Sequence, residues 1–227
     1  MRVLLVEDEI RLAENIVAAL RETGLVVDHA LDGEDGSHMA EQGIYDAIIL
    51  DLMLPGKSGQ MVLSDLRRKH LRTPVLILTA QEGKQSIIEL LNAGADDYLS
   101  KPFDLGELIA RVKAVIRRGK GVAHSKLTVA DVEVDTIHQT VTRCSETIDL
   151  SPTEYRILEY FVHRPRAVVS KRELLEHLYD FAWEHHSNVV EAHISNLRRK
   201  LNSVGEEPLI MTLRHRGYRL FSGTQRD

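Results

Sequence analysis

Acidic, hydroxyl and ammonium side chains follow or close short apolar segments in the first half of the chain. They are Glu7, Asp8, Asp51, Thr79 and Lys101. Carboxylates from different segments suit a hard divalent cation, and Mg²⁺ is the usual choice when a phosphate is the other partner. A carboxylate can also act as a nucleophile and form an aspartyl phosphate, while a cation, an ammonium and a hydroxyl neutralise charge. These residue types predict phosphoryl transfer to Asp51, the acid placed between the others.

Each of these residues alone has an ordinary structural explanation. An Asp after a strand is more often a turn residue, and Lys101-Pro102 by itself predicts only a loop. The functional interpretation depends on the whole set lying at successive strand ends. In that arrangement Lys101, held by the Pro after it, would supply the ammonium, and Thr79 would supply the hydroxyl.

The elements that position this set are predicted from alternating strand and helix patterns. Short apolar runs predict five strands, at 3–6, 26–30, 47–50, 74–79 and 97–99. Helical periodicity fills the segments between them, and a last helix begins at Asp104, with Glu107 placed as in a capping box. Five β-α units predict a doubly wound α/β fold with a five-stranded parallel sheet, because each crossover is right-handed and covers one face. Ligands of such sheets bind at the carboxyl edge, where the acids would meet.

The pattern changes beyond the Gly-Lys-Gly segment at 119–121. Short alternating strands are predicted at 127–135, 140–143 and 147–150. Capping boxes then open two helices, at Ser151 and at Ser170. Ser187 is predicted to open a third helix, with an apolar stripe of Val190, Ile194, Leu197 and Leu201, before a hairpin at 209–221. This order predicts an α+β winged helix-turn-helix, so we expect domains at 1–118 and 126–227 joined by a linker at 119–125.

Composition and charge fit a soluble chain with two domains of ordinary size. The 227 residues are 43% hydrophobic and 28% charged, and the single cysteine, Cys144, is expected as a buried or half-buried thiol, which fits a cytoplasmic protein. No apolar run reaches about 18 residues and no signal-peptide pattern follows Met1, so we expect no membrane partner. Residues 1–118 carry 14 basic against 19 acidic side chains, whereas residues 185–226 carry 7 against 3. The basic tail favours a polyanionic partner.

Four motifs at the predicted strand ends resemble the receiver domain of two-component response regulators. They are Val6-Glu7-Asp8-Glu9, Leu50-Asp51-Leu52-Met53-Leu54-Pro55-Gly56, Thr79-Ala80 and Asp96-Asp97-Tyr98-Leu99-Ser100-Lys101-Pro102-Phe103. With the second half included, the chain resembles the OmpR/PhoB class, whose receiver sheet has the strand order 2-1-3-4-5. The resemblance implies a DNA-binding transcription regulator, not an enzyme, which a sensor histidine kinase switches by phosphorylation. It also implies promoter DNA and RNA polymerase as partners.

The resemblance assigns roles within the receiver. Asp51 would accept the phosphoryl group, and Thr79 and Tyr98 would form the switch pair. The phosphate carries about two negative charges and attracts the Thr hydroxyl, which vacates space for the aromatic ring. An edge-strand aromatic half covered by a helix is the alternative explanation of Tyr98. The groups that would hold Mg²⁺ are the Asp8 and Asp51 carboxylates, the carbonyl of Met53 and, through water, Glu7.

Activated members of the class pair through the fourth helix, fifth strand and fifth helix by charged contacts. The matching positions are Asp96, Asp97, Glu107, Arg111 and Arg118. Ile87 stands where the class usually has a basic residue, so the interface is expected to be more apolar. Because surface ion pairs contribute only about 0–1 kcal/mol each, a homodimer should still form. A solvated charged face is the alternative explanation of these residues.

The third predicted helix of the second half would read the major groove of DNA. Seven residues of this helix face away from its apolar stripe or lie on the flanks of the stripe. They are Asn188, Ala192, His193, Ser195, Asn196, Arg198 and Arg199. Asn196 could bond an adenine, and Ala192 could meet a thymine methyl. The resemblance implies that three further residues would contact phosphates: His193, Arg198 and Arg199. A solvated basic helix end, favoured by the macrodipole, is the alternative.

The terminal hairpin resembles the wing of this class. Arg214 matches an arginine that enters the minor groove, and Arg216 adds charge. His215 stands where the class usually has Gly. Because a His tolerates a positive φ less well than Gly, we expect a different turn at the tip.

Two other functions compete with this hypothesis. A metal-dependent phosphatase could also form an aspartyl phosphate, but haloacid-dehalogenase enzymes carry a second Asp where this chain has Met53. A constitutive DNA-binding protein with a vestigial receiver is the third possibility. The intact set of acids, Thr and Lys argues against it.

Overall fold

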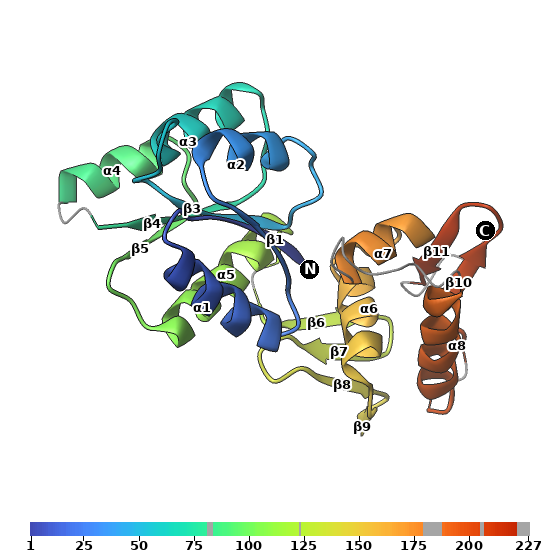
Figure 1. The fold of residues 1–227 in the computed structure, drawn as a ribbon. Helices are drawn as coiled ribbons and strands as arrows, with labels where there is room; N and C mark the ends of the chain where they lie inside the picture. Colours follow the sequence, from blue (N-terminus) through green and yellow to red (C-terminus); the bar gives the residue numbers. More distant parts are fainter. Residues whose placement is uncertain (81–83, 123, 179–187, 205–206, 222–227) are drawn as a thin grey trace. The chain divides into compact units, whose positions relative to one another are not determined.

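The computed structural model of the protein describes residues 1–80, 84–122, 124–178, 188–204 and 207–221. The chain divides into two compact units, Met1–Gly121 and Val122–Asp227 (Figure 1). Each unit has its own sheets and helices. The division falls inside the linker expected at 119–125, although the last helix of the first unit still includes Gly119.

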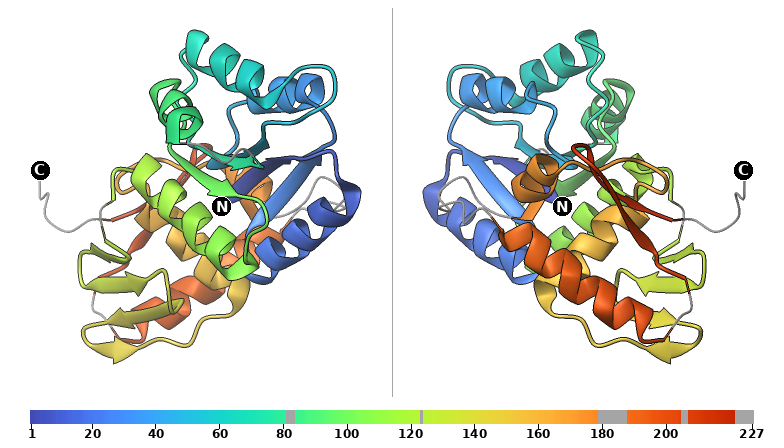
Figure 2. Two further views of the ribbon diagram at one scale, coloured as in Figure 1. Left: turned by 90° about the vertical axis from the view of Figure 1, so that its left-hand side faces the viewer. Right: turned by 90° about the vertical axis from the view of Figure 1, so that its right-hand side faces the viewer.

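Strands and helices alternate through the first unit around a parallel sheet. The strands pair in the order β2-β1-β3-β4-β5 and are β1 (Arg2–Val6), β2 (Val26–Ala30), β3 (Ala47–Asp51), β4 (Val75–Thr79) and β5 (Asp97–Ser100). The helices are α1 (Ile10–Glu22), α2 (Gly33–Ala40), α3 (Gly59–Arg68), α4 (Lys84–Asn92) and α5 (Leu105–Gly119). Helices α1 and α5 cover one face of the sheet, and the other three cover the opposite face (Figures 1 and 2). The predicted doubly wound fold and its strand order are confirmed.

The sheet of the first unit is buried on both faces, which explains why its strands are continuous apolar runs. Every residue of β1, β3 and β4 is buried. On the side of α3, Leu4, Leu50 and Ile77 from three neighbouring strands pack in one cluster with Leu63 and Leu66. Burying such a side chain stabilises the fold by about 1.5–3 kcal/mol. The strand ends, and the polar residues on them, are therefore held on a rigid base.

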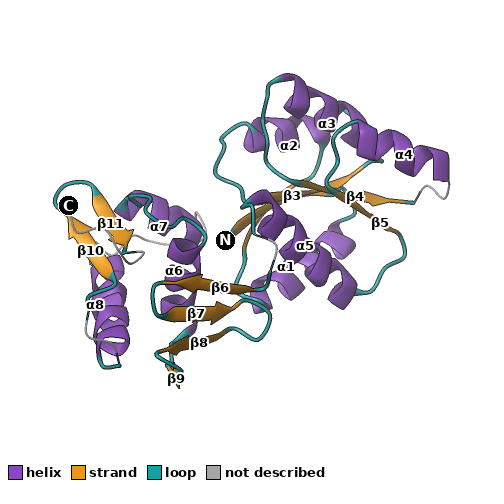
Figure 3. Ribbon diagram, turned by 180° about the vertical axis from the view of Figure 1, so that it is seen from behind, coloured by secondary structure: helices purple, strands orange, loops and turns teal. Residues whose placement is uncertain are grey.

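The described part of the second unit combines antiparallel strands with helices (Figure 3). A sheet of the order β6-β7-β8-β9 comes first, from β6 (Lys126–Val129), β7 (Val132–Asp135), β8 (Thr140–Arg143) and β9 (Glu146–Thr147). The helices are α6 (Pro152–Val162), α7 (Lys171–Leu178) and α8 (Val189–Asn202). The terminal hairpin is β10 (Ile210–Leu213) and β11 (Gly217–Leu220). This order confirms the predicted winged-helix arrangement.

Helix starts in the second unit agree only partly with the sequence patterns. The capping box at Ser151 and Glu154 is present in both directions at the start of α6. The Ser170 hydroxyl accepts a hydrogen bond from the Glu173 amide, but the Glu173 carboxylate accepts one from the Tyr160 hydroxyl. Helix α8 begins at Val189, with Asn188 at the N-cap position, and the predicted opening residue, 187, lies outside the described residues.

The cysteine lies in a different environment from the one expected. Cys144 is exposed, whereas the sequence analysis predicted a buried or half-buried thiol. It occupies the tight turn between β8 and β9, where Cys144 and Ser145 have φ values of 50° and 68°. Two successive left-handed residues are typical of a two-residue hairpin turn. Cys144 is exposed because it lies in a tight turn. The prediction was made from the apolar character of the side chain, which does not indicate a turn.

The described helices can also be compared with the length of a membrane span. In those parts of the chain, each helix is too short or too polar to traverse a bilayer.

Candidate functional site

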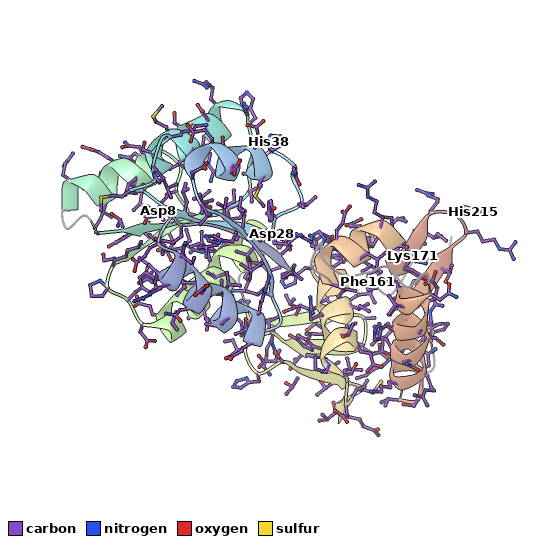
Figure 4. The ribbon with its side chains drawn as sticks, viewed as in Figure 1. Asp8, Asp28, His38, Phe161, Lys171 and His215 are labelled. Carbon is purple, nitrogen blue, oxygen red and sulfur yellow. The ribbon has the colours of Figure 1, made fainter. Side chains whose placement is uncertain are left out.

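Three carboxylates meet at the carboxyl edge of the parallel sheet. Glu7, Asp8 and Asp51 each offer an oxygen within 4.8 Å of the others. Glu7 and Asp8 follow β1, and Asp51 ends the neighbouring strand β3, so adjacent strand ends bring them together. Glu7 and Asp51 are buried, while Asp8, labelled in Figure 4, is exposed. The cluster is therefore open to solvent on the Asp8 side.

Lys101 joins two of these acids. Its Nζ lies 2.6 Å from Asp51 Oδ2 and 2.8 Å from Glu7 Oε2. Burial alone would lower the pKa of Lys101, but the hydrogen bonds and charges of Asp51 and Glu7 outweigh it and raise that pKa. Burial, together with the charge of Asp51, raises the pKa of Glu7, and the Lys101 hydrogen bond only partly opposes the rise. The ammonium thus supports a pair of carboxylates that repel one another.

The backbone around Asp51 is fixed by close packing. The Met53 amide donates a hydrogen bond to Asp51 Oδ1 at 2.9 Å. Gly59 begins α3 beside the Asp51 carbonyl, and a Cβ at this position would lie only 1.9 Å from that oxygen. Any larger residue would displace the main chain at Asp51. The sequence therefore needs Gly59 to hold the carboxylate in place.

The remaining predicted residues of this edge lie on the next two strands. Thr79 is buried at the end of β4, where its carbonyl accepts a hydrogen bond from the Lys101 amide at 2.7 Å. Tyr98 on β5 is half-buried and packs against the hydrophobic cluster under α3. Its partner in the strand register is Ile77, two residues before Thr79. Thr79 and Tyr98 thus lie on neighbouring strands, near the same edge of the sheet.

His29 is a contact at this edge that the sequence analysis missed. Its Nε2 lies 2.8 Å from the carbonyl oxygen of Glu7, and the Glu7 amide donates to the Ala30 carbonyl at 3.1 Å. The end of β2 therefore holds both main-chain polar groups of Glu7. The sequence did contain a signal for this contact. His29 is a polar residue just before the end of the strand that was predicted to lie next to β1.

The donor set fits a hard divalent cation. The described cluster offers only oxygen ligands, from Glu7, Asp8 and Asp51, and Met53 follows two residues after the last of them. With all four groups ionised, three carboxylates and the Lys101 ammonium carry a net charge of −2. Oxygen ligands and a surplus of negative charge are what Mg²⁺ requires of a protein.

Helix α8 of the second unit presents a polar face away from its buried stripe. Val190, Ile194, Leu197 and Leu201 are buried, as predicted. The opposite face exposes the short and basic side chains of Ala192, Ser195, Asn196 and Arg199, whereas His193 and Arg198 are half-buried. Asn188 is exposed at the N-cap of the helix instead of inside it. This exposed face has the residue types that contact base edges and phosphates.

Arg214, His215 and Arg216 are all exposed at the tip of the hairpin, where Figure 4 labels His215. His215 has a φ of 61°, and the Arg216 amide donates to the Leu213 carbonyl at 2.9 Å. His215 therefore adopts the left-handed conformation that favours Gly, so the reason given for expecting a different turn is wrong. A single αL residue costs only about 1–2 kcal/mol, which a tight hairpin can absorb.

The charged residues expected on a dimer surface are paired within the chain. The Arg111 guanidinium lies 3.1 Å from Asp97 and 2.8 Å from Glu107, and Arg118 lies 3.4 Å from Asp97. Asp96 pairs with Arg67 at 3.1 Å. On α4, Ile87 is half-buried and the adjacent Ile88 is exposed, as are Leu91 and Glu89.

Comparison with known proteins agrees with this architecture. Residues 3–113 match the family described as the response regulator receiver domain, and residues 145–220 match the C-terminal family of transcriptional regulatory proteins. The chain is 40% identical over 218 residues to the transcriptional activator protein IrlR of Burkholderia pseudomallei, covering 96% of this chain and 95% of the relative. It is 38% identical over 221 residues to the transcriptional regulatory protein CusR of Escherichia coli, covering 97% of each.

A solved structure supports the same assignment for the first unit. The receiver domain of the Francisella response regulator 1452 is 37% identical, with a TM-score of 0.50, and the match covers 52% of this chain and 97% of that one. The relatives named above are transcriptional regulators, and both halves of the chain match in the expected order. The chain therefore belongs to the two-component response regulators of the OmpR/PhoB class, transcriptional regulators that join a receiver domain to a DNA-binding domain.

Proposed function

We propose that Asp51 accepts a phosphoryl group from a sensor histidine kinase and that this switches binding of the second domain to promoter DNA. The observation that carries the proposal is the Lys101 ammonium, which lies 2.6 Å from Asp51 Oδ2 beside two further carboxylates. Lys101 draws charge away from the Asp51 carboxylate and would neutralise an incoming phosphoryl oxygen. Because promoter DNA is the proposed target, the protein would act in the cytoplasm. RNA polymerase would be a further partner.

The phosphoryl transfer needs little from the protein beyond position and charge. A carboxylate oxygen of Asp51 would form a bond to phosphorus as the bond from phosphorus to the kinase imidazole breaks, and the released imidazole would take a proton from water. Asp8, Asp51 and the Met53 carbonyl would hold Mg²⁺, with Glu7 acting through water. The metal supplies neutralisation of the charge on the transferred group. Lys101 would then exchange its contact with the carboxylate for one with the phosphoryl group.

The buried hydroxyl of Thr79 lies on the neighbouring strand and would bond the new phosphoryl group. Tyr98, half-buried near the same edge, would follow this movement by turning inward. That movement would alter the surface formed by α4, β5 and α5, and we propose that the activated chain dimerises there. Its charged residues are Asp96, Asp97, Glu107, Arg111 and Arg118.

In the second domain we propose a division of labour among the exposed residues. The residues that would contact bases are Asn188, Ala192, Ser195 and Asn196, whereas His193 and Arg199 would contact phosphates. Arg214 and Arg216 at the hairpin tip would enter or flank the minor groove. Asn196→Ala should therefore reduce discrimination between sites, while Arg199→Ala should weaken all sites and flatten the salt dependence. Equal effects of both substitutions on specific and random DNA would refute the division.

The direct test of the phosphorylation proposal is labelling by a small phosphodonor. Acetyl phosphate with Mg²⁺ should add one phosphoryl group to the wild-type chain, as measured by intact-mass spectrometry. Asp51→Asn should remain unlabelled, and Asp104→Asn, which changes an exposed cap residue of α5, should be labelled like wild type. Unchanged labelling of Asp51→Asn would remove this residue from the proposed role. Steady hydrolysis of a small phosphate ester would instead favour a phosphatase.

A further inference from the structure

Arg198 is part of α8, but its guanidinium contacts the terminal hairpin. Its Nε donates a hydrogen bond to the Ile210 carbonyl at 2.9 Å, and its Nη2 donates one to the Thr212 hydroxyl at 2.7 Å. The guanidinium carbon also lies 5.8 Å from the centre of the Tyr218 ring, within the range of a cation–π contact. One side chain of α8 therefore contacts both strands of the hairpin.

The hairpin presents a single face to this guanidinium. Thr212 on β10 is the register partner of Tyr218 on β11, and Ile210 is the partner of Leu220. Because side chains alternate along a strand and register partners share a face, these four residues lie on the same side of the hairpin. Ile210, Tyr218 and Leu220 are buried, whereas Thr212 is exposed. Arg198 thus contacts the hairpin on its mostly buried face, at the position where Thr212 is exposed.

The second strand of the hairpin, β11, is held by different contacts. The main chains of Val169 and Tyr218 exchange two hydrogen bonds of 2.8 Å. A Cβ at Gly217 would lie 2.1 Å from the Val169 carbonyl, so this approach requires glycine. These bonds fix the hairpin to the segment between α6 and α7. The Arg198 hydrogen bonds, in contrast, link the hairpin to α8 itself.

We propose that Arg198 is a positioning residue that fixes the hairpin relative to α8, so that both can engage one DNA duplex together. The inference rests on the proposed function, because it requires α8 and the hairpin to be the elements that read DNA. Two reading elements held in a fixed relation lose less conformational freedom on binding. The planar guanidinium suits this role because it donates to two acceptors in a fixed geometry, which an ammonium cannot reproduce. Arg199, which is exposed, remains available for phosphates.

The proposal differs sharply from a direct phosphate contact at Arg198. A phosphate contact needs charge, so Arg198→Lys would bind like wild type and Arg198→Gln would lower the salt slope by about one. A positioning role needs the two-point contact, so Arg198→Lys should bind about tenfold more weakly, a loss of about 1.4 kcal/mol. Thr212→Val, which removes an acceptor without changing charge, should show a similar loss. Met211→Leu, on the opposite face of β10, is the matched control and should bind like wild type.

The experiment measures affinity and salt dependence with the full-length chain. The probes are a duplex enriched by in-vitro selection with the wild-type protein and a random duplex of equal length. If Arg198 acts through the hairpin, Arg198→Lys should cause a smaller loss in an Arg214→Ala background than in the wild type, because part of the hairpin's contact with DNA is already gone. Full additivity of the two substitutions, or wild-type affinity of Arg198→Lys, would overturn the proposal.

Folding is checked separately by thermal denaturation of each variant. If Arg198→Lys does not fold, Thr212→Val carries the test, because that substitution keeps the guanidinium, and wild-type affinity of this variant would overturn the inference. Failure of the wild type itself to prefer the selected duplex would overturn the proposed function, and this inference with it.

Discussion

Lys101 holds two carboxylates that come from neighbouring strands and would otherwise repel one another. The residue types of this site could be predicted from the sequence, because each follows an apolar run that ends at the same edge of the sheet. The contact of His29 with Glu7 could not, since it depends on which side chain at the end of β2 reaches a particular carbonyl. The inward contacts of Arg198 were missed for a similar reason. A helix considered alone does not show which of its side chains a later hairpin will cover.

Removing the ammonium should destabilise the first domain. Lys101→Met leaves the buried carboxylates of Glu7 and Asp51 without their partner, so we expect a loss of about 1–3 kcal/mol in the free energy of unfolding. The control is Lys69→Met, which breaks an exposed ion pair with Glu41 and should cost only about 0–1 kcal/mol. Urea denaturation measures both. Equal, small losses would show that Lys101 adds no more than a surface charge.

His29 should stabilise the turn that carries Asp8. His29→Phe leaves the carbonyl of the buried Glu7 without this donor, so we expect a loss of about 1–3 kcal/mol in the free energy of unfolding. His29→Gln retains a donor of similar reach and should recover part of the loss. Chemical denaturation compares the two variants, and identical stabilities would argue that the hydrogen bond contributes nothing.

At the scale of elements, strands were easier to predict than helix starts. A strand buried on both faces is a continuous apolar run, and turn residues mark where it stops. The start of α8 was harder because Ser and Asn are both good N-cap residues, and they stand together at 187 and 188. The turn at His215 depended on backbone strain that a hairpin can absorb, and the turn at Cys144 on a local geometry that composition does not reveal.

The cap of α6 should make stability depend on pH. Burial alone would raise the pKa of Glu154, but hydrogen bonds from Lys200 and the Ser151 amide outweigh it and hold that pKa below 4.5. The folded state then binds fewer protons than the unfolded state, so this stabilisation is present above pH 4.5 and is lost as the pH falls through the folded-state pKa. Glu154→Gln should unfold more easily than wild type at neutral pH, with the difference shrinking in acid.

Denaturation midpoints across this pH range test the prediction, with the exposed residue Glu146 changed to Gln as a control. A difference between wild type and Glu154→Gln that stays constant with pH would contradict it.

At the scale of the whole molecule, the proposed dimer surface combines paired charges with exposed apolar side chains. Arg111 is already neutralised by Asp97 and Glu107, while Ile88 on α4 is 50% exposed. Arg111→Gln should therefore weaken dimerisation of the activated chain by less than about tenfold, because exposed ion pairs contribute little. Ile88→Glu should weaken it more, because it places a charge in an apolar contact. Analytical ultracentrifugation ranks the two variants, and the reverse order would show that ion pairs dominate.

The two-domain organisation and the class were within reach of the sequence, because both halves carry specific motifs over most of the chain. Communication between the domains is the part that motifs do not reveal. It requires that a charge added at one edge of the first sheet alter how α8 and the hairpin meet DNA. A constitutive DNA-binding protein would have the same fold and the same exposed residues.

The most direct measurement is the affinity of the full-length chain for its selected duplex with and without beryllofluoride and Mg²⁺, a stable mimic of an acyl phosphate. We expect the mimic to tighten binding by the wild type and to leave Asp51→Asn unchanged. Equal affinity of the wild type in both conditions would contradict the account.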